Sequence, residues 1–224
     1  KIELAQEKFD RALYWDEAFS AAYGGKAIVA ALKAKAIADA GYRGVEVERA
    51  EEYLEKARKL AETDNDRFEY QLAVVRVAPA VKGKDWLDRA EAAYRSSLSV
   101  EKLDERRLEY YQGKEAAAYF MGLAYLEGYQ FRKAEDKFRE TLDTRKMGKW
   151  NEPADKAWKK TSKIVRAMGG ITVGDVGRKI AVKDAVSRGD LAALLVDEMR
   201  IDKLLAGRRS EELTSELQSP NTIS

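Results

Sequence analysis

The chain has 224 residues, of which 45% are hydrophobic and 36% are charged, with a formal net charge of +2 and neither histidine nor cysteine. This composition can bury a core but excludes disulfides, thiolate metal sites and most histidine-dependent hydrolase sites, and the near-neutral charge argues against a dedicated nucleic-acid binder. Because prolines are few and Ala, Leu, Glu, Lys and Arg are abundant, we predict an all-α fold without a transmembrane segment.

A short pattern recurs along residues 1–147: an alanine is followed four positions later by a large apolar residue, and then by a small residue or leucine. The copies are Ala5, Phe9 and Ala12; Ala50, Leu54 and Ala57; Ala90, Tyr94 and Leu98; and Ala134, Phe138 and Leu142. A helix packed closely on its hairpin partner needs a small side chain at the crossing and a bulky one a turn later. The pattern therefore predicts helical hairpins in series.

Residues 115–143 carry the fullest copy of this pattern. Small and large residues alternate through both helices of the expected hairpin, at Gly122, Tyr125, Phe131, Ala134 and Phe138. This arrangement resembles the tetratricopeptide repeat (TPR), a helix–turn–helix unit of about 34 residues. The resemblance implies a superhelical array of TPR-like helix–turn–helix repeats over residues 1–147, followed by a small C-terminal helical appendage.

The spacing of the key alanines exceeds the length of a simple repeat. They lie 50 − 5 = 45, 90 − 50 = 40 and 134 − 90 = 44 residues apart, against about 34 in an undecorated array. We therefore expect lengthened helices or turns, including a long first helix within residues 23–44 that Gly24 and Gly25 interrupt or precede. An irregular helical bundle is the alternative.

Residues 148–170 differ in composition from the repeats. The sequence "TRKMGKWNEP" is typical of a loop, and Pro153 suits the start of a helix because its missing N–H would be unpaired there. We predict that the helix after it caps the array and ends at Gly169 and Gly170.

Residues 171–207 contain a capping box, in which Ser187 and Asp190 serve the free amides at the start of a helix that begins at Arg188. Ser187 to Asp190, followed by "LAALLV", partly resembles the end of an S-layer homology domain, which implies anchoring at the bacterial cell envelope. The alternative is an ordinary helix start without a binding role. The tail at 208–224 lacks apolar periodicity, and we expect it to be loosely ordered.

In a TPR-like array the first helix of each hairpin lines a concave face that binds a peptide or partner protein. The resemblance places eight residues there: Lys35, Asp39, Arg43, Arg76, Lys82, Tyr119, Leu123 and Glu127. Their mixed charges predict a polar peptide with an apolar anchor near Tyr119.

A local excess of basic residues lies within 154–188, where nine Lys or Arg face three Asp, 9 − 3 = +6. From this region we select Lys159, Lys160, Lys163 and Arg188 as a candidate basic surface for an acidic partner, an anionic cell-wall polymer or lipid head groups. A solvated helix face without a ligand is the alternative.

These observations predict a non-enzymatic protein-interaction scaffold with no catalytic residues, metal or cofactor. The S-layer likeness favours the periplasm or cell envelope over the cytoplasm. A cytoplasmic adaptor with a basic C-terminal contact surface is the alternative, followed by an enzyme that uses carboxylates or lysine. The sequence predicts neither the partner nor the oligomeric state.

Overall fold

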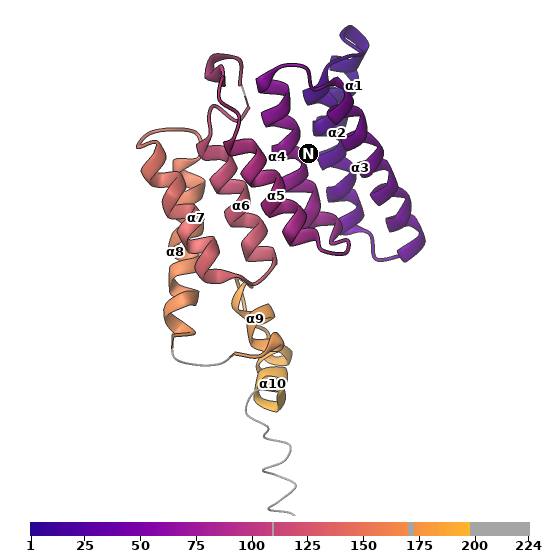
Figure 1. Cartoon of the computed structure of the whole chain (residues 1–224). Helices are drawn as coiled ribbons and strands as arrows, with labels where there is room; N and C mark the ends of the chain where they lie inside the picture. The colour runs from indigo at the N-terminus through magenta and orange to yellow at the C-terminus, as the bar shows by residue number, and fades with distance from the viewer. Residues whose placement is uncertain (109, 170–172, 198–224) are drawn as a thin grey trace, which may run out of the picture. The chain divides into compact units, whose positions relative to one another are not determined.

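A computed structural model describes residues 1–108, 110–169 and 173–197 of the chain. Within these ranges the secondary structure is helical, without strands, which confirms the all-α prediction (Figure 1). The elements are α1 (Ile2–Trp15), α2 (Ser20–Ala36), α3 (Ala40–Leu60), α4 (Asp64–Val81), α5 (Trp86–Leu98), the 3₁₀ helix η1 (Glu105–Arg107), α6 (Glu115–Glu127), α7 (Phe131–Thr144), α8 (Asn151–Ala167), α9 (Asp175–Ala181) and α10 (Arg188–Asp197).

The chain divides into two units, Lys1–Lys163 and Ile164–Ser224, with the boundary inside α8. In the second unit α9 contacts α10. Part of the predicted segment 171–207 and the whole predicted tail 208–224 lie outside the described residues.

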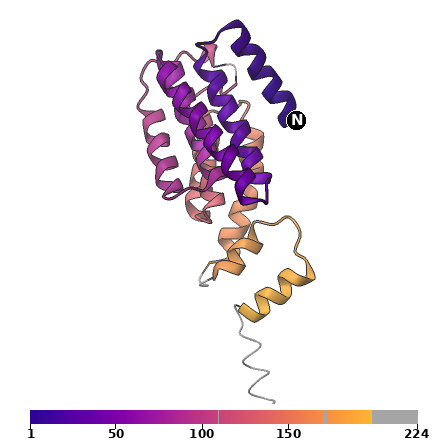
Figure 2. The same ribbon diagram turned by 90° about the vertical axis from the view of Figure 1, so that its right-hand side faces the viewer.

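Helices α2 to α7 form three hairpins in chain order: α2 with α3, α4 with α5, and α6 with α7. The first helices also contact one another in order, α2 with α4 and α4 with α6, and α1 lies beside α2 at the edge of the row (Figures 1 and 2). These contacts agree with the hairpins in series that the alanine pattern predicts.

The recurring alanines occupy close helix crossings in three of the four copies. Ala50, Ala90 and Ala134 are each 0% exposed, and Phe138 is buried with them. Gly122 has the same role in the facing helix, because a Cβ placed there would lie 2.6 Å from Cε1 of Phe138. In the first copy α1 has no fully buried residue, so this helix is covered on one side only.

The structure corrects the expectation of a long helix over 23–44. Residues 20–36 form α2, and α3 begins separately at Ala40. Gly24 and Gly25 lie inside α2 and are buried. Added Cβ atoms at these positions would lie 3.2 Å from Cβ of Ala73 and 2.2 Å from Cζ of Phe9, respectively. The two glycines therefore allow α4 and α1 to approach α2, and they do not break the helix.

Side chains define several helix ends. Thr63 and Asp66 form a capping box at the start of α4, and Asp39 accepts a hydrogen bond from the Tyr42 amide at the start of α3. In the second unit Ser187 and Asp190 form the predicted capping box: the Asp190 amide donates to Ser187 Oγ over 3.1 Å, and the Ser187 amide donates to Asp190 Oδ2 over 2.9 Å. The start of α10 at Arg188 is thereby confirmed.

Candidate functional site

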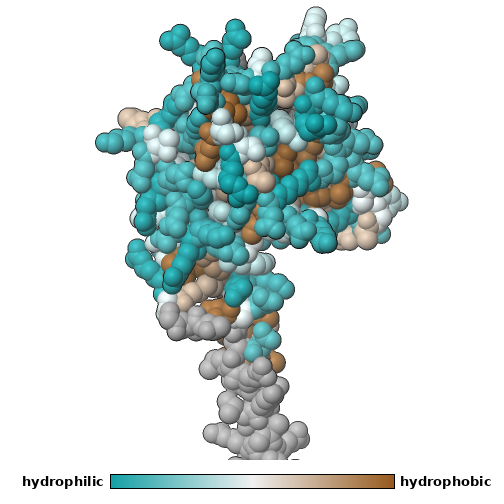
Figure 3. All heavy atoms as spheres, viewed as in Figure 1, coloured by the Kyte–Doolittle hydropathy of each residue, from teal (hydrophilic) through white to brown (hydrophobic). Residues whose placement is uncertain are grey.

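A cavity of about 870 Å³ opens within the first unit between α1, α2, α4 and the connector that joins α5 to α6. We call it the groove. Its apolar lining comes from α1, from the residues just before and within α2, and from α4: Ile2, Ala5, Phe9, Phe19, Ala21, Ala22, Gly24, Gly25, Ile28, Val29, Leu32 and Ala73. Small residues dominate on α2, so the groove is deep where that helix forms its floor. Figure 3 shows hydrophobic residues as separate patches on an otherwise largely hydrophilic surface.

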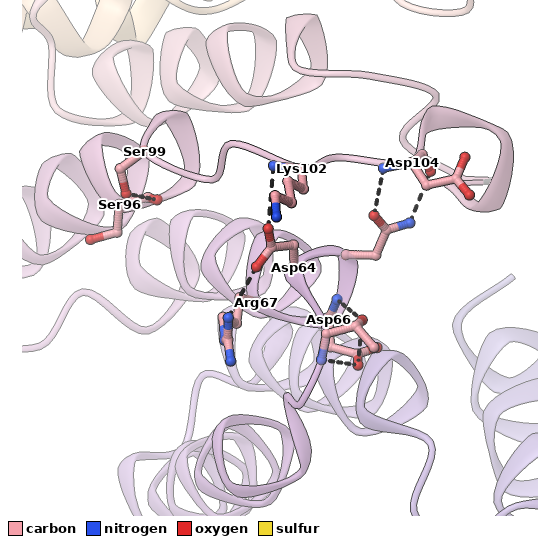
Figure 4. Close-up of polar contacts among 9 residues, drawn as sticks. Asp64, Asp66, Arg67, Ser96, Ser99, Lys102 and Asp104 are labelled. Carbon is pink, nitrogen blue, oxygen red and sulfur yellow. Dashed lines mark hydrogen bonds and ion pairs between the residues drawn. The ribbon is translucent and has the colours of Figure 1, made fainter.

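The connector is held against the start of α4 by a set of polar contacts (Figure 4). The Asn65 side-chain amide donates to the Asp104 carbonyl over 2.9 Å, and its oxygen accepts from the Asp104 amide over 2.9 Å. The Lys102 amide donates to Asp64 Oδ2 over 3.2 Å. These contacts position the following residues, Arg107, Tyr110 and Tyr111, as one wall of the groove.

Arg76 of α4 lies at the end of the groove, among aromatic rings. Its guanidinium carbon lies 4.5 Å from the centre of the Phe120 ring and 5.4 Å from that of Tyr110. Its Nη1 donates to the Tyr111 hydroxyl over 3.2 Å. Cation–π contact and this hydrogen bond hold the cation in place, although neither neutralises its charge.

Glu69 lies two helical turns before Arg76 and lines the same groove. Burial raises the pKa of its carboxyl to about 7, and the neighbouring Asp66 carboxylate contributes to the shift. Asp66 itself accepts hydrogen bonds from the Thr63 amide and hydroxyl. The carboxyl of Glu69 therefore titrates closer to neutral pH than an ordinary glutamate.

Beyond Arg76 the face of the unit is filled by an aromatic cluster of Tyr110, Tyr111, Tyr119, Phe120 and Trp150. The ring centres of contacting pairs lie 4.9–5.9 Å apart. Tyr119 stacks on Trp150 with an angle of 26° between the rings, and Trp150 Nε1 donates to the Tyr111 carbonyl over 2.7 Å. The groove ends where this cluster begins.

The structure distributes the eight predicted concave-face residues over three environments. Arg76 lines the groove. Tyr119 and Leu123 are partly buried against the core, with Tyr119 in the aromatic cluster. The remaining five, Lys35, Asp39, Arg43, Lys82 and Glu127, lie at or near helix ends and line none of the groove.

Three of these five come together as an ion cluster. Glu127 at the end of α6 pairs with Lys35 of α2 and, over 3.3 Å, with Lys82 at the end of α4. Arg43 lies nearby in α3 and donates to the Val81 carbonyl over 3.1 Å, whereas Asp39 caps α3. The cluster links successive first helices at one end of the row.

The four predicted basic-surface residues fall in both units. Lys159 pairs with Asp155 over 2.7 Å, Lys160 is partly buried, and Lys163 is exposed in the first unit. Arg188 is the exposed first residue of α10 in the second unit. Contact of this surface with an acidic partner or cell-wall polymer stays a prediction.

The sequence prediction missed most of the groove. Its α1 and α2 residues were assigned to helix packing, and "EYYQ", which contains Tyr110 and Tyr111, was assigned no role. A usable signal was the pair Gly24-Gly25 inside an alanine-rich helix, since small residues in a helix indicate close approach of another backbone or a ligand.

Among the residues that the structure describes, no group of three or more acidic side chains is arranged to hold a metal ion. Nor do those residues include a helix long and apolar enough to cross a membrane. Comparisons with protein-family models, curated proteins and solved structures find no match to this chain.

Proposed function

We propose that the first unit is a TPR-like scaffold that binds a peptide segment of a partner protein in the groove. The observation that carries the proposal is the groove itself, a largely apolar cavity of about 870 Å³ along the first helices of two successive hairpins. Apolar pockets with a few convergent polar groups are the usual form of binding sites in proteins.

The lining supports binding more than catalysis. The polar groups of the groove are Glu69 with its raised pKa, Arg76 held by rings, Tyr110 and Tyr111, the residues at the start of α4, and the exposed cations of Lys1 and Arg107. The hydroxyl of Thr63 donates to the Asp66 carboxylate over 2.7 Å, but both groups are held in the capping box of α4. The described groove residues include no hydrogen-bonded pair of carboxyls. A partner with apolar side chains and some polar groups fits this lining.

Selection from a displayed library of random nine-residue peptides against the purified chain tests the proposal. We expect the selection to enrich a set of peptides. The most enriched of them should bind the chain in a fluorescence-anisotropy titration. Ala21→Trp should reduce that affinity at least tenfold, because the indole would occupy the groove floor beside α2. Leu32→Glu should also reduce it by placing a charge on an exposed apolar part of the lining.

Ala36→Trp is the matched control, since Ala36 lies on the same helix, is exposed and lines none of the groove. Thermal melting by circular dichroism shows whether each variant is folded. The proposal is wrong if no peptide is enriched, or if the enriched peptides bind folded Ala21→Trp and Leu32→Glu as well as they bind the unaltered chain.

A further inference from the structure

Two charged groups of the groove wall, Arg76 and Glu69, form no ion pair with any side chain in the described part of the protein. The bond from Arg76 goes to a neutral hydroxyl, that of Tyr111. The electrostatic influence on Glu69 comes from a like charge, Asp66. A buried or half-buried charge without an opposite charge is costly, so a partner for each group would add to the affinity of a ligand.

These two groups lie on the same side of α4. They are seven residues apart, which is about two helical turns and about 10.5 Å along the axis. Ala73 lies between them, is 1% exposed and also lines the groove. The distance is too long for an ion pair between the two side chains, and Ala73 between them packs against Gly24 of α2, so the wall presents an acidic group and a basic group about two helical turns apart.

Other charges of the groove are already engaged or lie at its rim. Asp66 is bonded in the capping box of α4, and Arg107 lies 3.7 Å from Asp104 in an ion pair on the connector. Lys1 is exposed at the start of α1, and Tyr111 on the connector lies near both groups. Lys1 and Arg107 are solvent-exposed and Asp66 is hydrogen-bonded, so Glu69 and Arg76 are the partly buried groove charges that gain most from a charged ligand.

The surroundings of Arg76 also suit it to a carboxylate. The rings of Phe120 and Tyr110 lie over the guanidinium, while a guanidinium binds carboxylates through the N–H groups at its edge. A side chain held in this way loses little freedom when it binds, which favours affinity.

We propose that the groove recognises a peptide segment with an acidic side chain for Arg76 and a basic side chain for Glu69, about 10 Å apart. In a peptide with polyproline II geometry, which has three residues per turn and rises about 3.1 Å per residue, this separation corresponds to residues i and i+3 on one face. The inference rests on the proposed function and specifies the chemistry of its ligand.

The peptides enriched in the nonapeptide selection provide the test. We expect an acidic and a basic residue at a spacing of three to be over-represented among them. For the most enriched peptide, Arg76→Met should weaken binding by roughly 10- to 100-fold, the usual cost of losing a charged hydrogen bond. Methionine keeps the apolar stem between the rings, and Arg76→Lys should restore part of the affinity.

Changing the acidic residue of the peptide to glutamine should have the same effect without altering the protein. When this peptide change is combined with Arg76→Met, the loss of binding affinity should be little greater than for either change alone, as expected for two groups that contact each other. Arg67→Met and Glu62→Gln are matched controls, because both residues are exposed and line none of the groove.

Binding should also depend on pH through Glu69. Because the basic residue of the peptide prefers the ionised carboxyl, affinity should rise as the pH increases from 6 to 8, and Glu69→Gln should remove this rise. Equal affinity for unaltered chain, Arg76→Met and Glu69→Gln, together with loss of binding in Ala21→Trp, would contradict this inference and leave the proposed function standing. If the enriched peptides bind Ala21→Trp and Leu32→Glu as tightly as the unaltered chain, both this inference and the proposed function are contradicted.

Discussion

The groove and the aromatic cluster are neighbouring parts of one unit, and they differ in what occupies the space beside the first helices. Beside α2 the side chains are small, at Ala21, Ala22, Gly24 and Gly25, and a cavity remains. Beside α6 the same kind of space is filled by Tyr119, Phe120 and Trp150. Hairpins packed by one rule can therefore leave an open site or a closed core, depending on the aromatic residues of the first helix and of the segment that returns to it.

Trp150 shows this dependence most clearly. It follows the last hairpin in sequence, yet it stacks on Tyr119 and bonds to the connector at Tyr111. The side chain that the sequence selected as an apolar anchor, Tyr119, is thus partly buried by a residue of the same unit. The open part of the face lies instead beside α1.

The largest expected difference between the two regions concerns phenylalanine packing. Phe138 is 0% exposed and fits against Gly122, so Phe138→Ala should lower the free energy of unfolding by about 3–5 kcal/mol. Phe9 is partly exposed on α1, so Phe9→Ala should cost only about 1–2 kcal/mol. Urea denaturation of both variants measures the difference. Equal losses would show that α1 is packed as firmly as α7.

The next difference concerns buried carboxylates. Glu115 near the aromatic cluster is 2% exposed and pairs with Arg145, whose Nε lies 2.8 Å from Oε1. Glu69 in the groove has no such partner among the residues that the structure describes. Glu115→Gln should therefore destabilise the chain by about 1–3 kcal/mol. Glu69→Gln should instead stabilise it at pH 8, by a similar amount.

The pH dependence gives the sign of the Glu69 effect. Its pKa is raised from 4.5 to about 7 on folding, so the folded chain binds the proton more tightly than the unfolded chain. The contribution of Glu69 to the free energy of unfolding is fully present below pH 4.5 and is lost as the pH rises through 7. The benefit of Glu69→Gln should therefore be absent near pH 4 and complete near pH 8. A benefit independent of pH would mean that Glu69 titrates normally.

The smallest expected effect is the difference in stability between alanine substitutions at two helical glycines. Gly44 in α3 has open space where a Cβ would lie, so Gly44→Ala should stabilise the chain by about 0.5–1 kcal/mol through helix propensity. In α2 the Cβ of Gly25→Ala would meet the Phe9 ring at 2.2 Å, which should cancel that gain. Thermal melting compares the two; an equal gain in both would show that Phe9 moves aside without cost.

Much of the fold was predictable because local chemistry encodes it. The helical composition, the Ala-to-aromatic spacing around Ala134 and Phe138, and the capping box of Ser187 and Asp190 each depend on residues close together in the sequence. In the structure these signals correspond to the helices, to the buried residues where α7 packs on α6, and to the start of α10. For the candidate site, the sequence selected Arg76 as a residue of the concave face of a TPR-like array, which stays a prediction, and the structure has Arg76 in the lining of the groove.

The tertiary structure decided the rest, because it depends on contacts between residues distant in sequence. Gly24 and Gly25 could signal a break or a close approach, and only the presence of Ala73 and Phe9 at those positions distinguishes the two. Tyr119 is partly buried because Trp150, more than thirty positions later, returns to stack on it. Whether a face is open or filled is a property of the packed assembly, since local periodicity shows which side of a helix is apolar but not what lies against it.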